Sequence, residues 1–339
     1  MLKNNKNLWI IALIALVNAL GYGIIIPILY TYSQKFGLSD FQNGLLFSLF
    51  SICQFISTPF IGRLSDKYGR RPLLIISLAG TAVSFFMAAF APSAIFLYLA
   101  RALDGITAGN IPVASAVIAD TTRLQDRAKG YGIIGASFGF GFVFGPAISA
   151  LTVGYWASLP FIIAGVISTI AVCLTAFLLP ETNKHIGHIH KGKIFDLGRL
   201  VRAIGDPKVG TTLLITLFYG LSFGMFIFAF QPFSVKVLQL SANQISLIFT
   251  VVGIVGLITQ LFLLGKITKK FGLKRAFSLA LFFLSASFMA IFFTRSLSLF
   301  IITTVVLALS NSSVNPMIQT ILSRETDERS QGAILGLHA

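Results

Sequence analysis

The sequence predicts an all-α, polytopic membrane protein made of two related helical bundles, and three observations support this prediction. Of the 339 residues, 55% are hydrophobic and 11% are charged, and the mean hydropathy is +0.86. In soluble domains, charged residues usually make up about a quarter of the chain. Ten apolar runs each approach the ~20 residues that a helix needs to cross a bilayer. A charged segment between two of these runs returns in the second half, which indicates an internal duplication.

The first six apolar runs form the first predicted bundle. The run at 8–32 is too long for the core of a signal peptide and has no convincing small-residue cleavage site, so we expect a retained helix. We assign residues 1–180 to an N-terminal six-helix bundle and residues 181–209, rich in Lys and Arg, to a cytoplasmic linker. The remaining runs of this bundle lie at roughly 42–61, 72–91, 93–119, 130–152 and 157–179.

The second bundle, residues 210–339, is predicted to be incomplete. Residues 332–339 resemble the first turns of an eleventh helix, because the matching part of the first repeat enters its fifth helix there. If the second repeat matched the first, helices eleven and twelve would need about 43 further residues, so we expect a truncated copy. The full runs, helices seven to ten, lie at roughly 210–233, 243–265, 275–293 and 297–322.

The duplication is clearest in a charged loop. The segment GRLSDKYGRRPLL occupies residues 62–74, and a shorter counterpart, GKITKKFGLKRAF, occupies residues 265–277. Such regular recurrence predicts two copies of one structural unit. Further pairs keep the register at a spacing of 202 residues: Gln42 with Gln244, Arg127 with Arg329, and Gly130 with Gly332.

The basic residues sort to one side of the predicted topology. When the N-terminal lysines are placed in the cytoplasm, only Lys35, Lys236 and Arg295 fall in outer loops, and Arg101 lies within a helix. All the other Lys and Arg residues then face the cytoplasm, which is the positive-inside distribution of a protein with a cytoplasmic N-terminus. The net charge of +15 therefore reflects topology, and we expect no nucleic-acid partner.

The sequence argues against an enzyme. It contains no clustered nucleophile, no set of metal ligands and no nucleotide-binding loop of the form GxxxxGK[ST]. Three histidines, His185, His188 and His190, lie in the linker, but no Cys or acidic residue completes a four-ligand set there. We therefore interpret this segment as a solvated linker and expect no metal and no cofactor.

Two charged residues lie inside the fourth apolar run. With a rise of 1.5 Å per residue, Arg101 lies roughly 12 Å and Asp104 roughly 16 Å into a hydrocarbon core about 30 Å thick. Ionisable groups at this depth are costly and are functional candidates by default. At a spacing of three residues they share a helix face, so mutual neutralisation within one helix is the alternative interpretation.

The loop at 62–74 carries residue types that suit a state-dependent latch. Gly62 and Gly69 permit a tight turn, Asp66 lies near a helix N-terminus, and Arg70 has the length to reach a carboxylate. The simpler interpretation is a cytoplasmic loop whose positive charges fix the topology.

This loop resembles the signature of the major facilitator superfamily between helices two and three almost residue for residue. The resemblance implies two pseudo-symmetric six-helix bundles around a central cavity that opens alternately to each side. It also implies that Asp66, Arg70 and Asp120 form a charge relay that locks the outward-open state, with Asp66 facing the N-terminus of helix eleven. The segment YLARALDGITAGN resembles the fourth-helix motif of this family, whose buried arginine, here Arg101, is associated with proton transfer. Asp104 is then the carboxylate that Arg101 tunes.

The fifth apolar run is rich in small residues that allow close helix contact and a kink. Ordinary small-residue packing is one interpretation. The run also resembles the antiporter signature of drug exporters, although Ser149 and Ala150 stand where that pattern prefers glycines. The residues of this motif are Gly135, Gly139, Gly141, Gly145 and Pro146.

Among subfamilies, residues 105–122 and 135–146 are most similar to the tetracycline-type resistance exporters of bacteria. Those exporters carry an acidic residue in helix one where this chain has Asn18, so tetracycline itself is a minority expectation. Polar side chains within the spans suit a substrate-binding cavity, whereas interhelical hydrogen bonding is the alternative. These candidates are Asn18, Tyr22, Gln54, Gln231, Gln260, Asn311, Asn315 and Gln319.

We therefore expect a monomeric secondary transporter in the bacterial cytoplasmic membrane, with the lipid bilayer, protons and a small molecule as its partners. The favoured activity is proton-coupled export of small amphiphilic or drug-like molecules by alternating access. The alternatives are an uncoupled facilitator, an uptake transporter of a small metabolite, and an inactive truncated copy.

Overall fold

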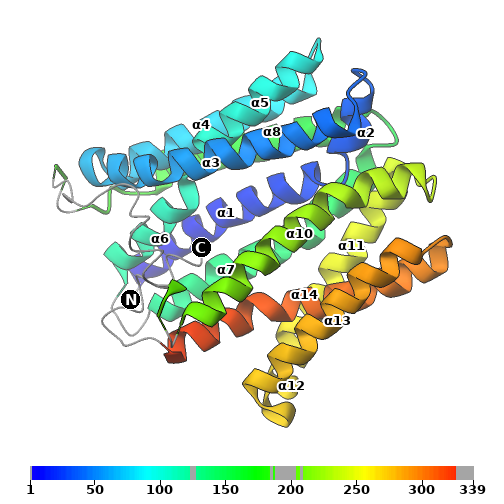
Figure 1. Cartoon of the computed structure of the whole chain (residues 1–339). Helices are drawn as coiled ribbons and strands as arrows, with labels where there is room; N and C mark the ends of the chain where they lie inside the picture. The colour runs from blue at the N-terminus through cyan, green and yellow to red at the C-terminus, as the bar shows by residue number, and fades with distance from the viewer. Residues whose placement is uncertain (1, 123–126, 184–185, 188–203, 207–208, 326–339) are drawn as a thin grey trace. The chain divides into compact units, whose positions relative to one another are not determined.

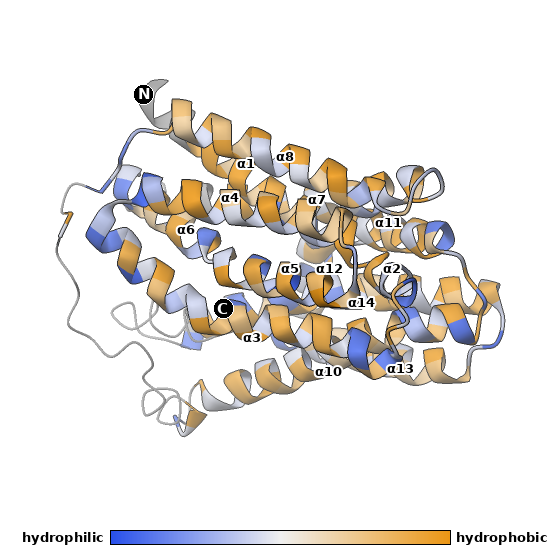
Figure 2. Cartoon of the chain, turned by 90° about the horizontal axis from the view of Figure 1, so that it is seen from above, coloured by the Kyte–Doolittle hydropathy of each residue, from blue (hydrophilic) through white to orange (hydrophobic). Residues whose placement is uncertain are grey.

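The computed structural model describes residues 2–122, 127–183, 186–187, 204–206 and 209–325. Within these residues the secondary structure is helical, without strands. Ten of the described helical segments are long and apolar enough to cross a membrane. Figure 2 shows apolar residues along the length of these helices and hydrophilic residues mainly toward their ends. The prediction of an all-α membrane protein with ten full spans is therefore confirmed.

The chain divides into two compact units. Unit 1 comprises Met1–Ile194 with Ser241–Thr250, and unit 2 comprises Phe195–Leu240 with Val251–Ala339. The division of the sequence at the linker 181–209 stays a prediction, because most of that linker lies outside the described residues.

Unit 1 contains the helices of the first predicted bundle (Figure 1). The helices are α1 (Leu2–Ile25), α2 (Leu29–Gln34), α3 (Asp40–Tyr68), α4 (Arg70–Ala89), α5 (Ala94–Thr107), α6 (Asn110–Thr121), α7 (Arg127–Thr152) and α8 (Leu159–Leu178). α1 packs along α7, and α3 packs along α5, whereas α4 contacts both α5 and α8.

Unit 2 is built around a pair of long helices, α13 and α14, and α10 contacts α14. Phe230 of α10 and Phe300 of α14 are buried, with ring centroids 5.2 Å apart. The helical segments of the second predicted bundle are α10 (Gly210–Lys236), α11 (Ala242–Ile258), a short π-helical stretch (Thr259–Leu263), α12 (Leu264–Phe271), α13 (Leu273–Phe293) and α14 (Leu297–Glu325). The first part of α11, as far as Thr250, is grouped with unit 1.

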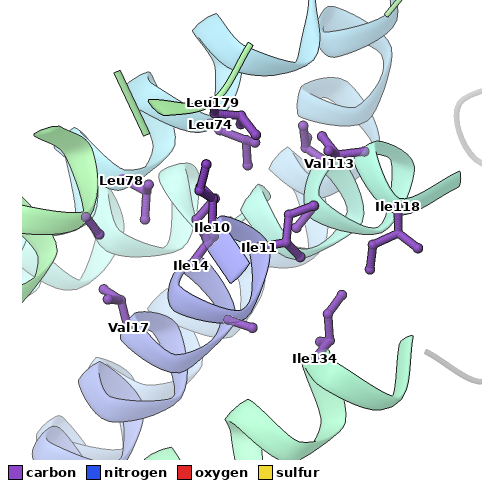
Figure 3. Close-up of a cluster of buried hydrophobic side chains, with 14 residues drawn as sticks. Ile10, Ile11, Ile14, Val17, Leu74, Leu78, Val113, Ile118, Ile134 and Leu179 are labelled. Atoms are coloured by element: carbon purple, nitrogen blue, oxygen red, sulfur yellow. The ribbon is translucent and has the colours of Figure 1, made fainter. Parts of the chain in front are cut away.

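One apolar cluster of unit 1 surrounds the first helix (Figure 3). Ile11 and Ile14 of α1 are fully buried, and they pack with Leu74 of α4 and with Val113 and Ile118 of α6. Lipid is as apolar as these side chains, so close packing stabilises such contacts more than transfer from water does. The cluster thereby holds α6 against α1.

The fourth predicted run, 93–119, forms one span, but this span consists of two helices and not of the single continuous helix that we expected. The helix ends at Thr107, and the next begins at Asn110. Pro112 has no N–H to donate to the carbonyl of Ala108, and its ring crowds that carbonyl. Gly109, in the interruption, has an ordinary φ of −75°, and a methyl group there would lie 2.6 Å from Cδ1 of Ile61 on α3.

The internal duplication extends to backbone detail. Ser39 and Gln42 exchange hydrogen bonds of 2.9 and 3.3 Å at the start of α3, and Ser241 and Gln244 repeat both bonds at the start of α11. Each of these is a capping box, in which two otherwise unpaired backbone N–H groups are satisfied. The pairing of Gln42 with Gln244 in the sequence therefore has a structural basis.

Candidate functional site

Arg101 and Asp104 form an ion pair within the fourth span. Nη1 of Arg101 donates to Oδ2 of Asp104 over 2.9 Å, and the two residues are only 6% and 7% exposed. The guanidinium also lies 4.2 Å from the ring centroid of Phe50 on α3. Sequence reasoning missed Phe50, because no sequence pattern links it to a helix about fifty positions later. Pairing offsets part of the cost of burying each ion in the bilayer.

The groups around Asp104 come from three helices. The hydroxyl groups of Thr81 and Ser84 on α4 lie beside its carboxylate, and the phenol of Tyr22 on α1 lies close enough to interact electrostatically with the pair. A small cavity next to the pair is lined by Ser84, Arg101, Asp104 and mainly apolar side chains. Nε of Arg101 is buried and has no hydrogen-bond partner in the described part of the chain. The negative charge of Asp104 is therefore balanced mainly by one guanidinium.

The predicted latch residues lie together where α3 ends and α4 begins. Nη1 of Arg70 lies 2.7 Å from Oδ1 of Asp66, and Nε of Arg70 lies 3.2 Å from Oδ2 of Asp120 at the end of α6. Nη1 of Arg70 also donates to the Ser65 hydroxyl over 2.6 Å. One arginine thus joins α3, α4 and α6.

Glu181, which the sequence reasoning did not single out, completes this cluster. Its carboxylate accepts the backbone N–H groups of Arg70 and Arg71 over 2.9 and 3.1 Å. These are unpaired donors at the first turn of α4, where a negative charge is also favoured by the helix dipole. Asn183 follows and donates its side-chain amide to the carbonyl of Asp66 over 2.9 Å. The sequence feature that could have indicated Glu181 is its position as an acidic residue just beyond the sixth apolar run.

The two glycines predicted to permit the turn have different roles. Gly69 has a φ of +104° and separates α3 from α4, and a methyl group there would lie 2.3 Å from Oε2 of Glu181. Gly62 lies inside α3, where a methyl group would meet no described atom within 4 Å. The turn therefore depends on Gly69, and the expectation that Gly62 forms part of it was wrong, because α3 continues to Tyr68.

The small residues of the fifth span form a close contact with α1. A methyl group on Gly141 would lie 2.2 Å from Cβ of Ala19, and one on Gly145 would lie 2.8 Å from the backbone of Gly23. Ser149 Oγ donates to the carbonyl of Ile24 over 2.7 Å. Pro146 is buried on the same face, near Gly23, whereas Gly139 is half-buried and a methyl group on Gly135 would meet open space within the described structure.

Among the polar candidates of unit 1, Asn18 is engaged in the protein itself. Its Oδ1 accepts from the side-chain amide of Asn110 over 2.9 Å, and its Nδ2 donates to the carbonyl of Ile14 over 2.8 Å. For Asn18 the structure therefore favours interhelical hydrogen bonding. Tyr22 is 38% exposed and Gln54 is half-buried.

The polar candidates of unit 2 lie at different depths. Gln231 is buried, and Gln260 is an exposed residue of the π-helical stretch. Oδ1 of Asn311 accepts from the Tyr219 hydroxyl over 2.8 Å, a partner that the sequence did not reveal. Asn315 and Gln319, on the same helix, are exposed.

The three linker histidines lie outside the described residues. In the part of the chain that the structure does describe, no group of three His, Cys, Asp or Glu side chains has an arrangement that would hold a metal ion.

Known proteins resemble this chain along nearly its whole length. The tetracycline resistance protein, class B, of Escherichia coli is 31% identical, over 98% of this chain and 84% of its own length. Multidrug resistance protein 2 of Bacillus subtilis (strain 168) is 29% identical, over 83% of this chain and 71% of its own length.

Solved transporter structures share the fold. A variant of the nucleoside transporter NupG has a TM-score of 0.78 at 13% identity, over 98% of this chain and 86% of that chain. A bacterial homologue of the human lysosomal transporter Spinster, inward-facing and unoccupied, has a TM-score of 0.77 at 19% identity, over 99% of this chain and 78% of that chain. The family described as the Major Facilitator Superfamily matches residues 11–209 and 212–339. This multi-pass membrane protein, a transporter and not an enzyme, therefore belongs to the Major Facilitator Superfamily.

Proposed function

We propose that this chain is a proton-coupled exporter of small amphiphilic or drug-like molecules that works by alternating access. The observation that carries the proposal is the buried pair of Arg101 and Asp104 inside a membrane span. An ionisable carboxyl group at this depth is expensive to keep and is a candidate proton carrier. The names of the similar proteins, a tetracycline resistance protein and a multidrug resistance protein, support drug-like substrates and the export direction.

The proposed coupling step is a proton transfer at one carboxylate. When a proton from the outside binds Oδ2 of Asp104, the negative charge disappears, and the Arg101 guanidinium loses its ion-pair partner but keeps its contact with the face of Phe50. This change alters the relative energies of the states that open to each side. Release of the proton to the cytoplasm restores the ion pair, and the substrate leaves in the opposite direction.

Gating is assigned to the cluster of Asp66, Arg70 and Asp120, with Glu181 and Gly69 holding its geometry. We propose that these charges hold the cytoplasmic end closed while the transporter is open to the outside. The basic residues near this end support its placement in the cytoplasm, together with the N-terminus, in the bacterial cytoplasmic membrane. The tight contact of Gly141 and Gly145 with α1 is proposed to favour exchange over leak, because it leaves little space between these two helices.

Substrate contacts are proposed for the polar side chains that retain exposed surface. These are Tyr22, Gln54, Gln260, Asn315 and Gln319. We propose that Asn18 and Asn311 lie at the edge of the substrate site, where each is held by its hydrogen bond to Asn110 or Tyr219. Gln231 is buried, and we propose that it lies behind the side chains that contact the substrate. We further propose that the protein acts as a monomer of two bundles, that protons are its coupling ion, and that it needs no cofactor.

Substrate-dependent proton movement in inverted vesicles tests the proposal. Addition of a substrate from a panel of lipophilic drugs is expected to release protons from acidified vesicles of the wild type and of Asp206→Asn, an acid outside the spans, but not of Asp104→Asn. Drug flux without proton movement in the wild type would instead identify an uncoupled facilitator.

A further inference from the structure

The interruption of the fourth span lies between two charged sites. α5 ends at Thr107 and α6 begins at Asn110, within one apolar stretch, Ala94–Thr121, that is long enough to cross the membrane. α5 carries the buried ion pair, and α6 carries Asp120 at its far end, where it meets Arg70. In a continuous helix the two sites would move as one rigid body. Here the helix between the two sites is interrupted at residues 108 and 109.

The two segments share α3 and α4 as neighbours, but a tight contact and hydrogen bonds join them to different helices. α5 packs tightly on α3: a methyl group on Gly105 would lie 2.4 Å from the carbonyl oxygen of Phe50, and Ser57 Oγ donates to the Gly105 carbonyl over 3.1 Å. α6 is fastened to α1, because Asn110 is 0% exposed and donates its amide to Asn18 over 2.9 Å. Movement of α5 against α6 therefore keeps the α3–α5 and α1–α6 hydrogen bonds, and it is taken up where α3 and α4 contact both segments.

The second unit supplies an internal comparison. Its helix α14 corresponds to α5 and α6 and contains Pro316, yet it is continuous from Leu297 to Glu325. Proline alone therefore does not interrupt this span. α14 contains no glycine and no membrane-embedded ion pair. Within the described structure, the interruption occurs in the half that carries the charged pair.

We propose that Ala108–Gly109 is a joint that transmits the protonation state of Asp104 to the contact between Arg70 and Asp120, and that Pro112 is the positioning residue that keeps this joint open. The inference rests on the proposed role of Asp104 as the proton site. The groups that face Asp104 are Arg101 on its own helix, Tyr22 on α1, and the hydroxyl groups of Thr81 and Ser84 on α4. Loss of the Asp104 charge weakens the hold on Arg101, and α5 reorients about the joint while α6 stays with α1.

A single cysteine near the latch reports on this transmission. Lys67→Cys is introduced into a Cys53→Ala, Cys173→Ala background, since Lys67 is exposed and adjoins the latch without belonging to it. Labelling by a membrane-impermeant maleimide is measured in inverted vesicles at pH 6 and pH 8, normalised to denatured protein at each pH. The Lys67→Cys protein, with Asp104 and Pro112 unchanged, is expected to label about fivefold or more faster at pH 6, in the range of typical coupling energies.

Pro112→Ala restores the backbone N–H and is expected to remove this pH response. Pro316→Ala, the same substitution within α14, is expected to leave the response intact. If Asp104→Asn abolishes the response and Pro112→Ala does not, the joint is overturned while the proton site stands. If Asp104→Asn keeps the response, the proposed proton site fails, and the joint fails with it.

A second measurement does not depend on the folding of Pro112→Ala. Spin labels at Ile95 on α5 and Thr121 on α6 are expected to change their separation between pH 6 and pH 8. Labels at Leu299 and Thr320, along the continuous α14, are expected to keep theirs. A constant separation of the first pair would overturn the joint.

Discussion

Asn110 donates its side-chain amide to Oδ1 of Asn18 over 2.9 Å, and this bond joins the fourth span to the first. In unit 2, Tyr219 donates to Oδ1 of Asn311 over 2.8 Å, again between the first and fourth spans of the repeat. In both pairs the partners are 92 residues apart. The duplication thus preserves a polar bridge between the same two helices, although the residues that form it have changed.

Asn110→Ala is expected to destabilise the protein by about 1 kcal/mol, because Oδ1 of Asn18 then loses its donor in a buried environment. Thermal unfolding in detergent checks this, with a decrease in Tm of about 2–4 °C expected. Asn315→Ala, at an exposed position of α14, is the control and is expected to change stability by no more than about 0.5 kcal/mol. Equal effects of the two substitutions would show that the bridge contributes nothing specific.

Gly69→Ala is expected to disrupt the latch. The backbone conformation at Gly69 is one that other residues adopt only at a cost of about 1–3 kcal/mol, and the new methyl group would displace the Glu181 carboxylate from the start of α4. Transport and Tm should both fall. Gly62→Ala, seven residues earlier within α3, is expected to preserve transport and to raise stability by about 0.5–1 kcal/mol. A fully active Gly69→Ala protein would contradict this account of the turn.

Gly145→Ala is expected to separate α7 from α1, since its methyl group would lie 2.8 Å from the backbone of Gly23, which cannot move aside as a side chain can. Overpacking of this kind costs about 1–3 kcal/mol. Tm and drug flux measure the effect. Gly135→Ala on the same helix faces open space and is expected to be neutral or slightly stabilising. Loss of function in Gly135→Ala would mean that the motif acts through something other than helix contact.

The sequence allowed prediction of those features that depend on local patterns. The length of each apolar run predicted ten spans, and spacing alone predicted that Arg101 and Asp104 share a helix face. The latch residues Asp66 and Arg70 lie within one motif, so their contact was also accessible. The end of α3 was placed too early, because a helix continues into charged residues beyond the apolar run, up to Tyr68.

Contacts between distant segments were not predictable in this way. Glu181 meets Arg70 across 111 residues, and nothing in either local sequence specifies this approach. The two prolines of the fourth and tenth spans look alike in sequence, yet of these two only Pro112 accompanies an interruption, near the tight contacts of Gly105 and Gly109. The hydrogen bond that Asn18, a predicted substrate contact, accepts from Asn110 is visible only once the helices are assembled.

Drug uptake into inverted vesicles, with and without an imposed pH gradient, tests the role of Asp104 most directly. In the wild type, an acidic interior is expected to drive accumulation of the drug against its gradient. Asp104→Asn is expected to lose this accumulation but to retain exchange of labelled for unlabelled drug across the membrane, which shows that the protein is folded and binds substrate. Accumulation by Asp104→Asn that still follows the imposed pH gradient would contradict the proposal that this carboxylate couples proton movement to export.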